Sequence, residues 1–320
     1  MYHRISAEAC DPWAICVPPR DFDEQLAVLA EARAAVDLSA FAGESGYAPD
    51  GCRVAVTFDD AYVDNLTFAL PLLERHEIPA TLFVVGNAIG RRREFWWDAV
   101  QRAVLESGPL PDSLVLDLGQ TTHTLTLTEQ ERTAATDDGW RADGTTPGTP
   151  RQQLFATLWG LIVTLAPEEQ DAAVDQLLSW AGQPITAPPD RLPMGPEQLN
   201  SFAAHPLITI GSHTLDHRSL PDLSAEQQRH QVVAGHRRVT ELTGCVPDRF
   251  SYPFGRFTEA ARTVLPELGV RLACTSVPTP ATMGDDRLAL PRLHATAMDG
   301  DRFARWLRRD QGICRRSSAA

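Results

Sequence analysis

Short apolar runs alternate with amphipathic stretches along most of the chain. The runs are rich in β-branched and aromatic residues and are short enough to be buried strands, whereas the stretches between them carry apolar residues three and four positions apart, which is the period of a helix. This alternation is typical of βα units built around a parallel sheet. It predicts strands over residues 52–58, 80–86, 207–212, 249–254 and 271–276.

Helices are predicted before, between and after these strands. The clearest start is at Ser224, because a serine followed three positions later by a glutamine, here Gln227, forms a capping box. We predict helices over residues 22–36, 64–76, 224–243, 258–268 and 301–309, and we expect Asp64 to cap the second of them.

The alternation stops between about residues 91 and 196. This segment contains an aromatic run (Phe95, Trp96, Trp97), an alternating pattern over 113–128 that predicts a β-hairpin, and an amphipathic helical region over 152–180. We interpret it as a large, mainly helical insertion in one α/β domain that covers residues 1–320; a separately folded second domain is the alternative. A cap over a site and a dimer-forming element are both open roles for it.

The composition narrows the classes of function. The chain has 320 residues, with 29 basic against 42 acidic side chains and a formal net charge of -13. This acidic balance argues against a nucleic-acid partner, which requires a basic surface. All the basic residues counted here are arginine, so lysine-dependent chemistry such as a Schiff base is excluded. The six cysteines contain no C-x-x-C pair, which predicts buried free thiols rather than a disulfide framework or a zinc ribbon.

No segment has the pattern of an export signal or a membrane span. Residues 1–13 show no basic region followed by an apolar one. No apolar run approaches the length of about 20 residues that a membrane-spanning helix needs. We therefore expect a cytoplasmic protein with no stable membrane insertion.

Two motifs follow predicted strands, where α/β proteins place their sites. Asp59 and Asp60 form the first, and such a carboxylate pair can bind a metal through one member while the other acts as a base. His213 and His217 form the second, and residues four apart share one face of a helical turn. Together they predict an Asp-His-His metal site. An Asx turn or helix cap, and two unrelated surface histidines, are the structural alternatives.

A third motif, Phe250-Ser251-Tyr252-Pro253-Phe254-Gly255, also ends a predicted strand. Proline fixes the backbone, and glycine allows it to approach a ligand closely. Such a turn can direct a backbone N–H toward a developing oxyanion. Taken alone, the motif is also compatible with an ordinary turn.

The three motifs, in this order, resemble those of the polysaccharide deacetylases, the NodB-homology or carbohydrate esterase family four proteins. Thr57-Phe58-Asp59-Asp60-Ala61-Tyr62 is similar to the family's T-F-D-D motif. His213-Thr214-Leu215-Asp216-His217 is similar to its H-S/T-x-x-H motif, and the third is similar to the variant Y-P-F/Y-G. The resemblance covers residues 1 to about 90 and 196 to about 298.

The resemblance implies a distorted (β/α) barrel of about seven strands and metal-dependent hydrolysis of an N-acetyl group. Asp59 would be the general base, and Asp60, His213 and His217 would hold a divalent metal. The Phe254 N–H would help to bind the oxyanion. Zinc is the expected metal, although cobalt, nickel and manganese also suit such ligands.

The sequence departs from the family pattern in its third motif. The arginine that commonly precedes this motif and holds the base is replaced by Ser251, and Arg292 is our candidate substitute. The alternative for Arg292 is a surface arginine at a strand end.

His294 and His3 are both candidates for the general acid, with simple packing as the alternative. His3 lies in a Tyr2-His3-Arg4 element that resembles a first-strand element of members with the variant third motif. Because Met1 precedes it directly, we expect the chain to begin inside that strand. A late start codon would explain this.

Trp96, Trp97 and Tyr252 are candidate sugar contacts, and the alternative for the tryptophans is structural packing. The remaining histidines, expected in solvent, are His76, His123, His205, His230 and His236.

The expected function is metal-dependent removal of an N-acetyl group from an amino-sugar-containing substrate, an intracellular biosynthetic intermediate. The alternatives are hydrolysis of a non-sugar amide, imide or formamide at the same site, and a non-catalytic sugar-binding scaffold. A homodimer is compatible with each of these.

Overall fold

The computed structural model describes residues 1–41, 53–119, 121–133, 139–142, 146–282 and 284–310. The chain divides into two compact units. The first comprises Met1–Ala7, Ile15–Gly90 and Pro193–Ala320, and the second comprises Glu8–Ala14 and Arg91–Leu192. The second unit therefore contains most of the segment interpreted as an insertion, together with residues 8–14, which the sequence pattern does not connect with that segment.

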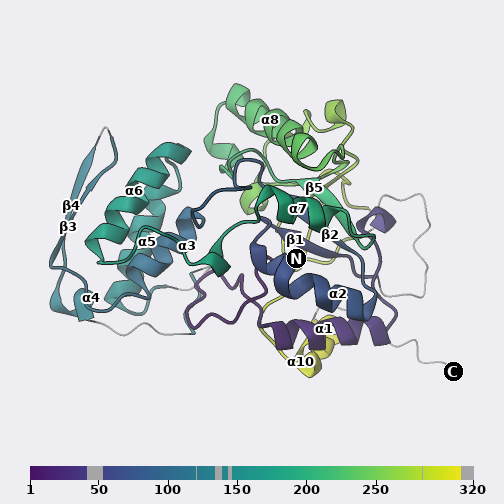
Figure 1. Ribbon diagram of the computed structural model, residues 1–320, viewed down its shortest axis with the longest axis horizontal. Coiled ribbons are helices and arrows are strands. Elements are labelled where there is room, and N and C mark those ends of the chain that lie inside the picture. The colour runs from purple at the N-terminus through teal and green to yellow at the C-terminus, as the bar shows by residue number, and fades with distance from the viewer. Residues whose placement is uncertain (42–52, 120, 134–138, 143–145, 283, 311–320) are drawn as a thin grey trace. The chain divides into compact units, whose positions relative to one another are not determined.

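The first unit is built around a curled parallel sheet with the strand order β1-β2-β5-β6-β7 (Figure 1). The strands are β1 (Val56–Asp59), β2 (Ala80–Val84), β5 (Ile208–Ser212), β6 (Arg249–Ser251) and β7 (Leu272–Cys274). All five predicted strands are confirmed. All five are shorter than expected: β1 and β5 begin later, β2 and β6 end earlier, and β7 does both. Residue 52, where the first predicted strand begins, lies outside the described residues.

Two extended segments continue this sheet at its edges and connect them. Tyr2 pairs in parallel with Phe58 of β1, and Leu290 pairs in parallel with Cys274 of β7. The Met1 amine donates to the Leu293 carbonyl at 2.8 Å, and the Ala295 N–H donates to the Met1 carbonyl at 3.1 Å. The five strands and these two segments form the distorted α/β barrel that the resemblance implied.

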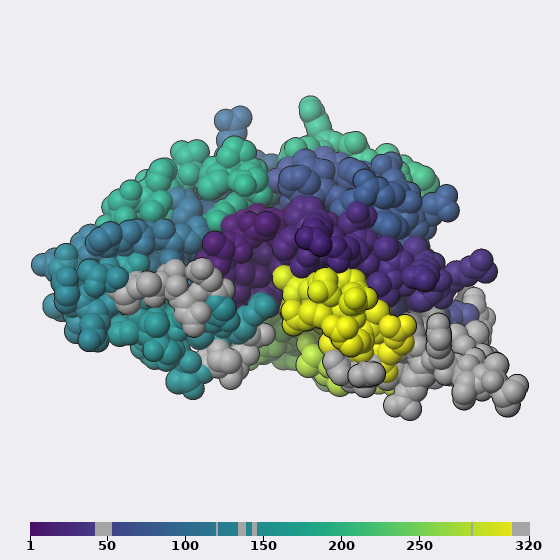
Figure 2. Space-filling model, turned by 90° about the horizontal axis from the view of Figure 1, so that it is seen from below, coloured from purple at the N-terminus to yellow at the C-terminus, as the bar shows by residue number. Residues whose placement is uncertain are grey.

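Helices cover the outside of the sheet. They are α1 (Pro19–Glu31), α2 (Leu70–His76), α7 (Pro196–Ala203), α8 (Ala225–Thr243), α9 (Glu259–Arg262) and α10 (Gly300–Arg305). Alternate apolar residues of the strands, such as Leu82 and Ile210, share one core with helical residues such as Leu26 and Phe202. Figure 2 shows α10, in yellow, on the surface beside the purple N-terminal part of the chain that contains α1.

The predicted helices are confirmed in position and differ in their ends. The capping box predicted at Ser224 and Gln227 opens α8. The helix predicted over 258–268 is only one turn long and is followed by a 3-10 turn at Pro266–Leu268, because a proline within a helix removes one of its hydrogen bonds. The π-turn Asn65–Ala69 precedes α2.

Asp64 does not cap the helix that follows it, which corrects our prediction. Its buried carboxylate instead accepts hydrogen bonds from the Arg4 Nε at 3.1 Å and from the Ile5 N–H at 3.0 Å. Asn65 donates to the His3 carbonyl at 2.8 Å. These contacts hold the first extended segment against the loop after β1.

The second unit contains α3 (Trp96–Val104), α4 (Glu129–Thr133), α5 (Pro150–Ile162), α6 (Pro167–Trp180) and a hairpin of β3 (Ser113–Asp117) and β4 (Thr122–Thr126). The hairpin is confirmed as an antiparallel pair. The helical region predicted over 152–180 is two helices, because Pro167 starts a new one. Glu8 joins this unit through an ion pair with Arg191 at 2.7 Å.

Trp96 and Trp97 are buried in an aromatic cluster of this second unit. Trp97 stacks on Phe95 with ring centroids 4.5 Å apart, and Trp96 contacts Trp97 at 5.5 Å and Trp159 at 5.4 Å. Because only 8% of Trp96 and 7% of Trp97 is exposed, their rings serve packing in this structure and offer no open face to a sugar.

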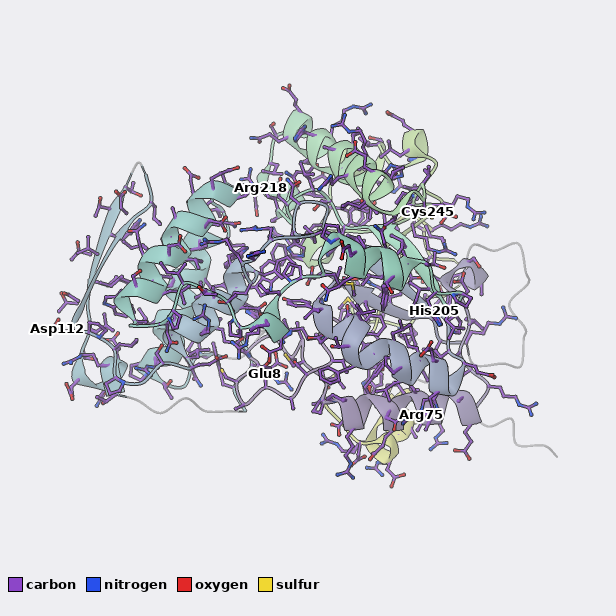
Figure 3. The ribbon with its side chains drawn as sticks, in the orientation of Figure 1. Glu8, Arg75, Asp112, His205, Arg218 and Cys245 are labelled. Atoms are coloured by element: carbon purple, nitrogen blue, oxygen red, sulfur yellow. The ribbon has the colours of Figure 1, made fainter. Side chains whose placement is uncertain are left out.

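The described cysteines are free thiols. Cys10, Cys16 and Cys274 are buried as expected, whereas Cys245, which follows α8, is exposed (Figure 3). Within the described ranges, no helix has the combined length and apolarity to cross a membrane.

Candidate active site

Three strand ends carry the polar residues of the site. Asp59 ends β1 and Asp60 follows it, Ser212 ends β5 and His213 follows it, and Ser251 ends β6. The strands are parallel, so their carboxyl ends lie at the same edge of the sheet. Residues 192 positions apart in the chain, Asp59 and Ser251, therefore come within 3.2 Å of each other.

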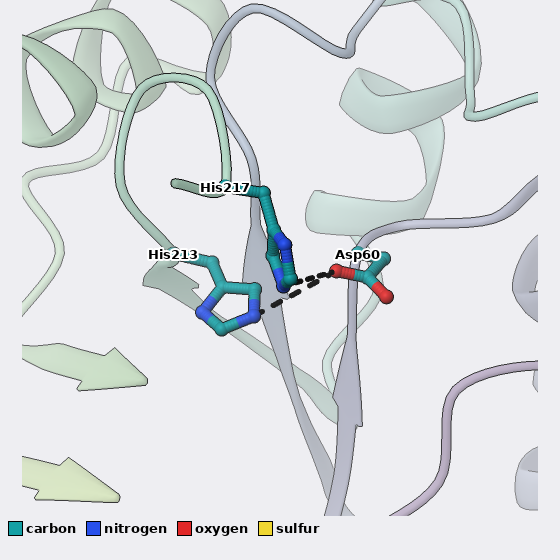
Figure 4. A group of neighbouring side chains, drawn as sticks. All are labelled: Asp60, His213 and His217. Carbon is teal, nitrogen blue, oxygen red and sulfur yellow. Dashed lines mark ion pairs between the residues drawn. The ribbon is translucent and has the colours of Figure 1, made fainter. Parts of the chain in front are cut away.

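Asp60, His213 and His217 converge on one point (Figure 4). The Asp60 Oδ1 atom lies 3.7 Å from His213 Nε2 and 3.5 Å from His217 Nε2. Ligand atoms about 2.0–2.1 Å from a tetrahedral zinc ion are about 3.4 Å apart, so the spacing suits such an ion. All three residues are buried.

The protonation state of the two imidazoles also suits a metal. Burial lowers the pKa of His213. Burial also lowers the pKa of His217, and the neighbouring His213 adds to this effect, so the pKa of His217 lies well below its usual value. The His213 Nδ1 atom lies 2.7 Å from the Ser251 carbonyl oxygen. A carbonyl only accepts hydrogen bonds, so Nδ1 carries the proton and Nε2 presents its lone pair toward Asp60. A lone pair and a carboxylate at this distance repel each other unless a cation lies between them, so the donor set fits a divalent metal.

Asp59 is held by Arg292 rather than by the histidines. The Arg292 guanidinium makes two hydrogen bonds to the carboxylate, Nη1 to Oδ1 at 2.8 Å and Nη2 to Oδ2 at 2.7 Å. Arg292 Nη2 also donates to the Ser251 hydroxyl at 2.8 Å, and this hydroxyl donates to Asp59. The serine that departs from the family pattern is thus part of the same hydrogen-bond network as the arginine proposed to compensate for it.

The charge of Asp59 is set by two opposing effects. Burial raises the pKa of this carboxyl, but the charges of Arg292 and His213 and the hydrogen bonds from Arg292 outweigh burial and hold the pKa well below its usual range. Asp59 is therefore ionised at neutral pH, as a proton acceptor must be.

We expect Arg292→Met to destabilise the metal-free protein by about 3–5 kcal/mol at pH 7, because it leaves the Asp59 carboxylate buried without its partner. The wild-type pair stabilises the fold above the unfolded-state pKa of about 3.9 and loses this contribution as the pH falls toward the lower folded-state pKa. In the variant, Arg292 no longer opposes burial, so burial raises the folded-state pKa of Asp59. The variant then recovers stability as this carboxyl takes up a proton at falling pH. The stability difference from wild type should therefore shrink as the pH is lowered, which denaturant titrations between pH 7 and pH 4 would measure.

Arg271→Met is the matched control, since the Arg271 side chain is 62% exposed in its pair with Asp248. It should cost less than about 1 kcal/mol at any of these pH values. Equal costs for the two variants would contradict a structural ion pair at Asp59.

The third motif reaches the same centre. The Phe254 ring lies 4.7 Å from the His217 ring, and Phe254 has a positive φ of 56°. A Cβ added to the next residue, Gly255, would lie 2.3 Å from the Ser276 nitrogen, so the turn needs glycine there. Strained backbone of this kind clusters at functional sites, and five residues here have positive φ: Asp60, Ala61, Thr214, His217 and Phe254.

Comparison with known proteins shows which family the chain belongs to. The polysaccharide deacetylase family model matches residues 47–108 and 165–273, together more than half of the chain. The chain belongs to the polysaccharide deacetylase family. The second matched range begins two residues before α6, so part of the second unit lies within the match.

Relatives of this polysaccharide deacetylase family member agree with the assignment. The polysaccharide deacetylase homologue YxkH of Bacillus subtilis (strain 168) is 28% identical over 112 residues, which cover 35% of this chain and 40% of YxkH. The match therefore spans less than half the length of that relative.

Solved structures share the fold. The Streptococcus pyogenes deacetylase PplD has a TM-score of 0.52 at 16% identity, with 94% of this chain and 93% of PplD covered. IcaB from Ammonifex degensii has a TM-score of 0.57 at 17% identity, with coverage of 95% and 94%.

His3 and His294 lie side by side in this polysaccharide deacetylase family member. Their ring centroids are 5.5 Å apart, because the segment containing Leu293 and Ala295 is hydrogen-bonded to Met1. Burial lowers the pKa of His3 to about 4, against the opposing effect of Asp59. The structure therefore brings together both histidines that the sequence offered as alternatives.

Tyr252 is fully buried, which corrects its assignment as a sugar contact. Its hydroxyl donates to the Leu288 carbonyl at 2.9 Å, and its ring stacks on Phe257 at 4.6 Å. His236 is also buried rather than solvated, and its Nε2 donates to the Pro247 carbonyl at 2.9 Å.

Several residues of the site gave no signal in the sequence. The Thr275 carbonyl accepts from Arg292 Nε at 2.9 Å, and Gln231 and Asn87 contact the loop between His213 and His217. Their residue types are common and their roles depend on contacts across the fold. Only the contacts seen in the tertiary structure identify them as part of the site.

Proposed function

We propose that this protein is a metal-dependent hydrolase that removes an N-acetyl group from an amino-sugar-containing substrate. The observation that supports this most directly is the division of labour between the two adjacent carboxylates. Asp59 is held ionised by Arg292, 2.7 Å away, whereas Asp60 lies 3.5 Å and 3.7 Å from the two histidine nitrogens. One carboxylate is thus arranged as a base and the other as a ligand.

Asp60, His213 and His217 would hold a divalent cation, most simply zinc. Bound there, the cation would polarise the acetyl carbonyl and lower the pKa of water. The His213 Nδ1–H bond to the Ser251 carbonyl fixes the tautomer that presents Nε2 to the cation. Thr214 braces the loop, since its hydroxyl accepts from the His217 N–H at 3.1 Å.

Asp59 would accept the proton of the attacking water. Its two hydrogen bonds from Arg292 fix the orientation of the carboxylate throughout the reaction. The Phe254 N–H would stabilise the oxyanion that forms at the carbonyl oxygen. The His3–His294 pair would relay to the departing nitrogen the proton that Asp59 takes from the water, so that Asp59 returns to its carboxylate form. Acetate and a free amine would be the products.

Removal of metal should abolish this activity. We expect purified protein to release acetate from at least one member of a panel of N-acetylated sugars and nucleotide sugars. Dialysis against a chelator should stop the release, and Zn²⁺ or Co²⁺ should restore it. Circular dichroism of the dialysed protein controls for unfolding.

Release that survives complete metal removal would contradict the proposed role of the triad. Hydrolysis of a formamide or imide, followed as loss of that substrate, without acetate release from any sugar would favour the non-sugar alternative. Absence of both metal binding and release would favour a scaffold. The cytoplasmic location, the intracellular biosynthetic substrate and the homodimer stay predictions.

A further inference from the structure

The loop that carries the two histidines has a backbone that its own sequence does not favour. Thr214 and His217 have φ values of 65° and 56°. Residues with side chains persist in this region only where the surrounding structure fixes them. In this shape the loop places His217 Nε2 3.5 Å from Asp60 Oδ1, so contacts that fix the loop also fix the candidate metal centre.

Gln231 of α8 makes three hydrogen bonds to this loop. Its backbone carbonyl accepts from the Leu215 N–H at 3.0 Å. Its side-chain Oε1 accepts from the Asp216 N–H at 3.0 Å, and its Nε2 donates to Asp216 Oδ2 at 2.7 Å. Gln231 is 5% exposed, so water competes little for these bonds.

The helix also touches the loop one turn later. A Cβ added to Gly235 would lie 2.3 Å from the Thr214 carbonyl carbon. Gly235 and Gln231 are four positions apart and share one face of α8. The absence of a side chain at Gly235 thus lets the helix approach closely enough for Gln231 to reach the loop.

The loop is fixed from its other side by the residues after β2. The Gly86 N–H donates to the Thr214 carbonyl at 3.0 Å, and the Asn87 N–H donates to the Leu215 carbonyl at 2.8 Å. The Asn87 side chain donates to Asp216 Oδ1 at 2.7 Å. Asp216 therefore receives one amide from each side, with Gln231 providing the buried one.

We propose that Gln231 is a positioning residue for the centre formed by Asp60, His213 and His217. It contacts no candidate ligand, and it acts by holding Leu215 and Asp216 so that the flanking histidines converge. This inference rests on the proposed function, because it assumes that the three residues bind a metal. The ordering of the loop can nevertheless be measured without metal or substrate.

The test compares Gln231→Leu with Gln228→Leu. Gln228 is a matched control because it is also a buried glutamine of α8, at 4% exposure. Its side chain bonds to the Leu223 carbonyl and the Thr258 hydroxyl instead of the loop.

In the metal-free protein, amides 214–217 should exchange hydrogen faster in Gln231→Leu than in wild type. In Gln228→Leu they should exchange as in wild type. Titration with Zn²⁺ should show an affinity about 10–100-fold lower for Gln231→Leu alone, the usual effect of losing an outer partner of a metal site.

A reciprocal exchange separates positioning from loss of stability. Gln231→Glu alone places two carboxylates against each other at Asp216 and should weaken Zn²⁺ binding. Combining it with Asp216→Asn reverses donor and acceptor between the two side chains at unchanged net charge. The carboxylate at position 231 still accepts from the backbone N–H of residue 216, and the amide oxygen at position 216 still accepts from Asn87. The double variant should therefore recover both Zn²⁺ affinity and slow hydrogen exchange.

Unchanged loop exchange in Gln231→Leu, or failure of the double variant to recover, would overturn the inference. A wild-type protein that binds no divalent metal would instead overturn the proposed function, while the exchange measurement would still decide the role of Gln231.

Discussion

Replacing Asp59 with asparagine is expected to lower kcat by about 10²–10⁴-fold, the range that a positioned general base contributes. The amide keeps the shape of the side chain but cannot accept the proton. Zn²⁺ affinity should change little, because the Asp59 atom nearest the triad, Oδ2, lies 3.8 Å from His213 Nε2 and is bound by Arg292. Steady-state kinetics and Zn²⁺ titration on the same preparation would measure both quantities.

The variant will also be less stable, since Arg292 loses its charged partner in a buried site. Rates should therefore be compared at a temperature where both proteins are folded. Asp37→Asn is a suitable control, because Asp37 is likewise paired with an arginine, Arg249, at 2.8 Å but lies outside the site. It should keep wild-type kcat. Full turnover by Asp59→Asn would remove Asp59 from the role of base.

His213→Ala should abolish both metal binding and turnover. It removes one of three ligands, so the loss of Zn²⁺ affinity should exceed the approximately 10–100-fold effect of removing an outer partner. It also leaves the Ser251 carbonyl without the imidazole bond at 2.7 Å. Isothermal titration with Zn²⁺ and metal analysis after dialysis would show the loss directly.

His236→Ala distinguishes this effect from general disruption. His236 is also a buried histidine bonded to a backbone carbonyl, that of Pro247 at 2.9 Å. Its removal should lower stability while Zn²⁺ affinity stays at the wild-type value. If His213→Ala bound zinc as tightly as His236→Ala, the proposed ligand set would be wrong.

The candidate ligands could be predicted because their signals are local. His213 and His217 lie within one loop, and Asp59 and Asp60 are adjacent. Each pair follows an apolar run that specifies a buried strand, and parallel strands bring their ends to one edge. No long-range information was needed to expect these four side chains together.

The corrected assignments concern residues whose role depends on what covers them. Trp96, Trp97 and Tyr252 suggested sugar contacts because aromatic rings serve that role as readily as packing. Their surroundings decide between the two, and all three are buried. Asp64 looked like a helix cap until Arg4, 60 positions earlier, was found against it.

By itself, the sequence determined the order of strands and helices, the types of the candidate metal ligands and the strand ends that carry them, because these depend on residues near one another in the chain. Only the tertiary structure decided that Arg292 holds Asp59 across 233 positions, that His3 and His294 are neighbours, and that Gln231 is hydrogen-bonded to the histidine loop. Each of these contacts exists because the curled sheet brings its two edges together and α8 lies against its loops, and such proximity leaves no periodic trace in the sequence.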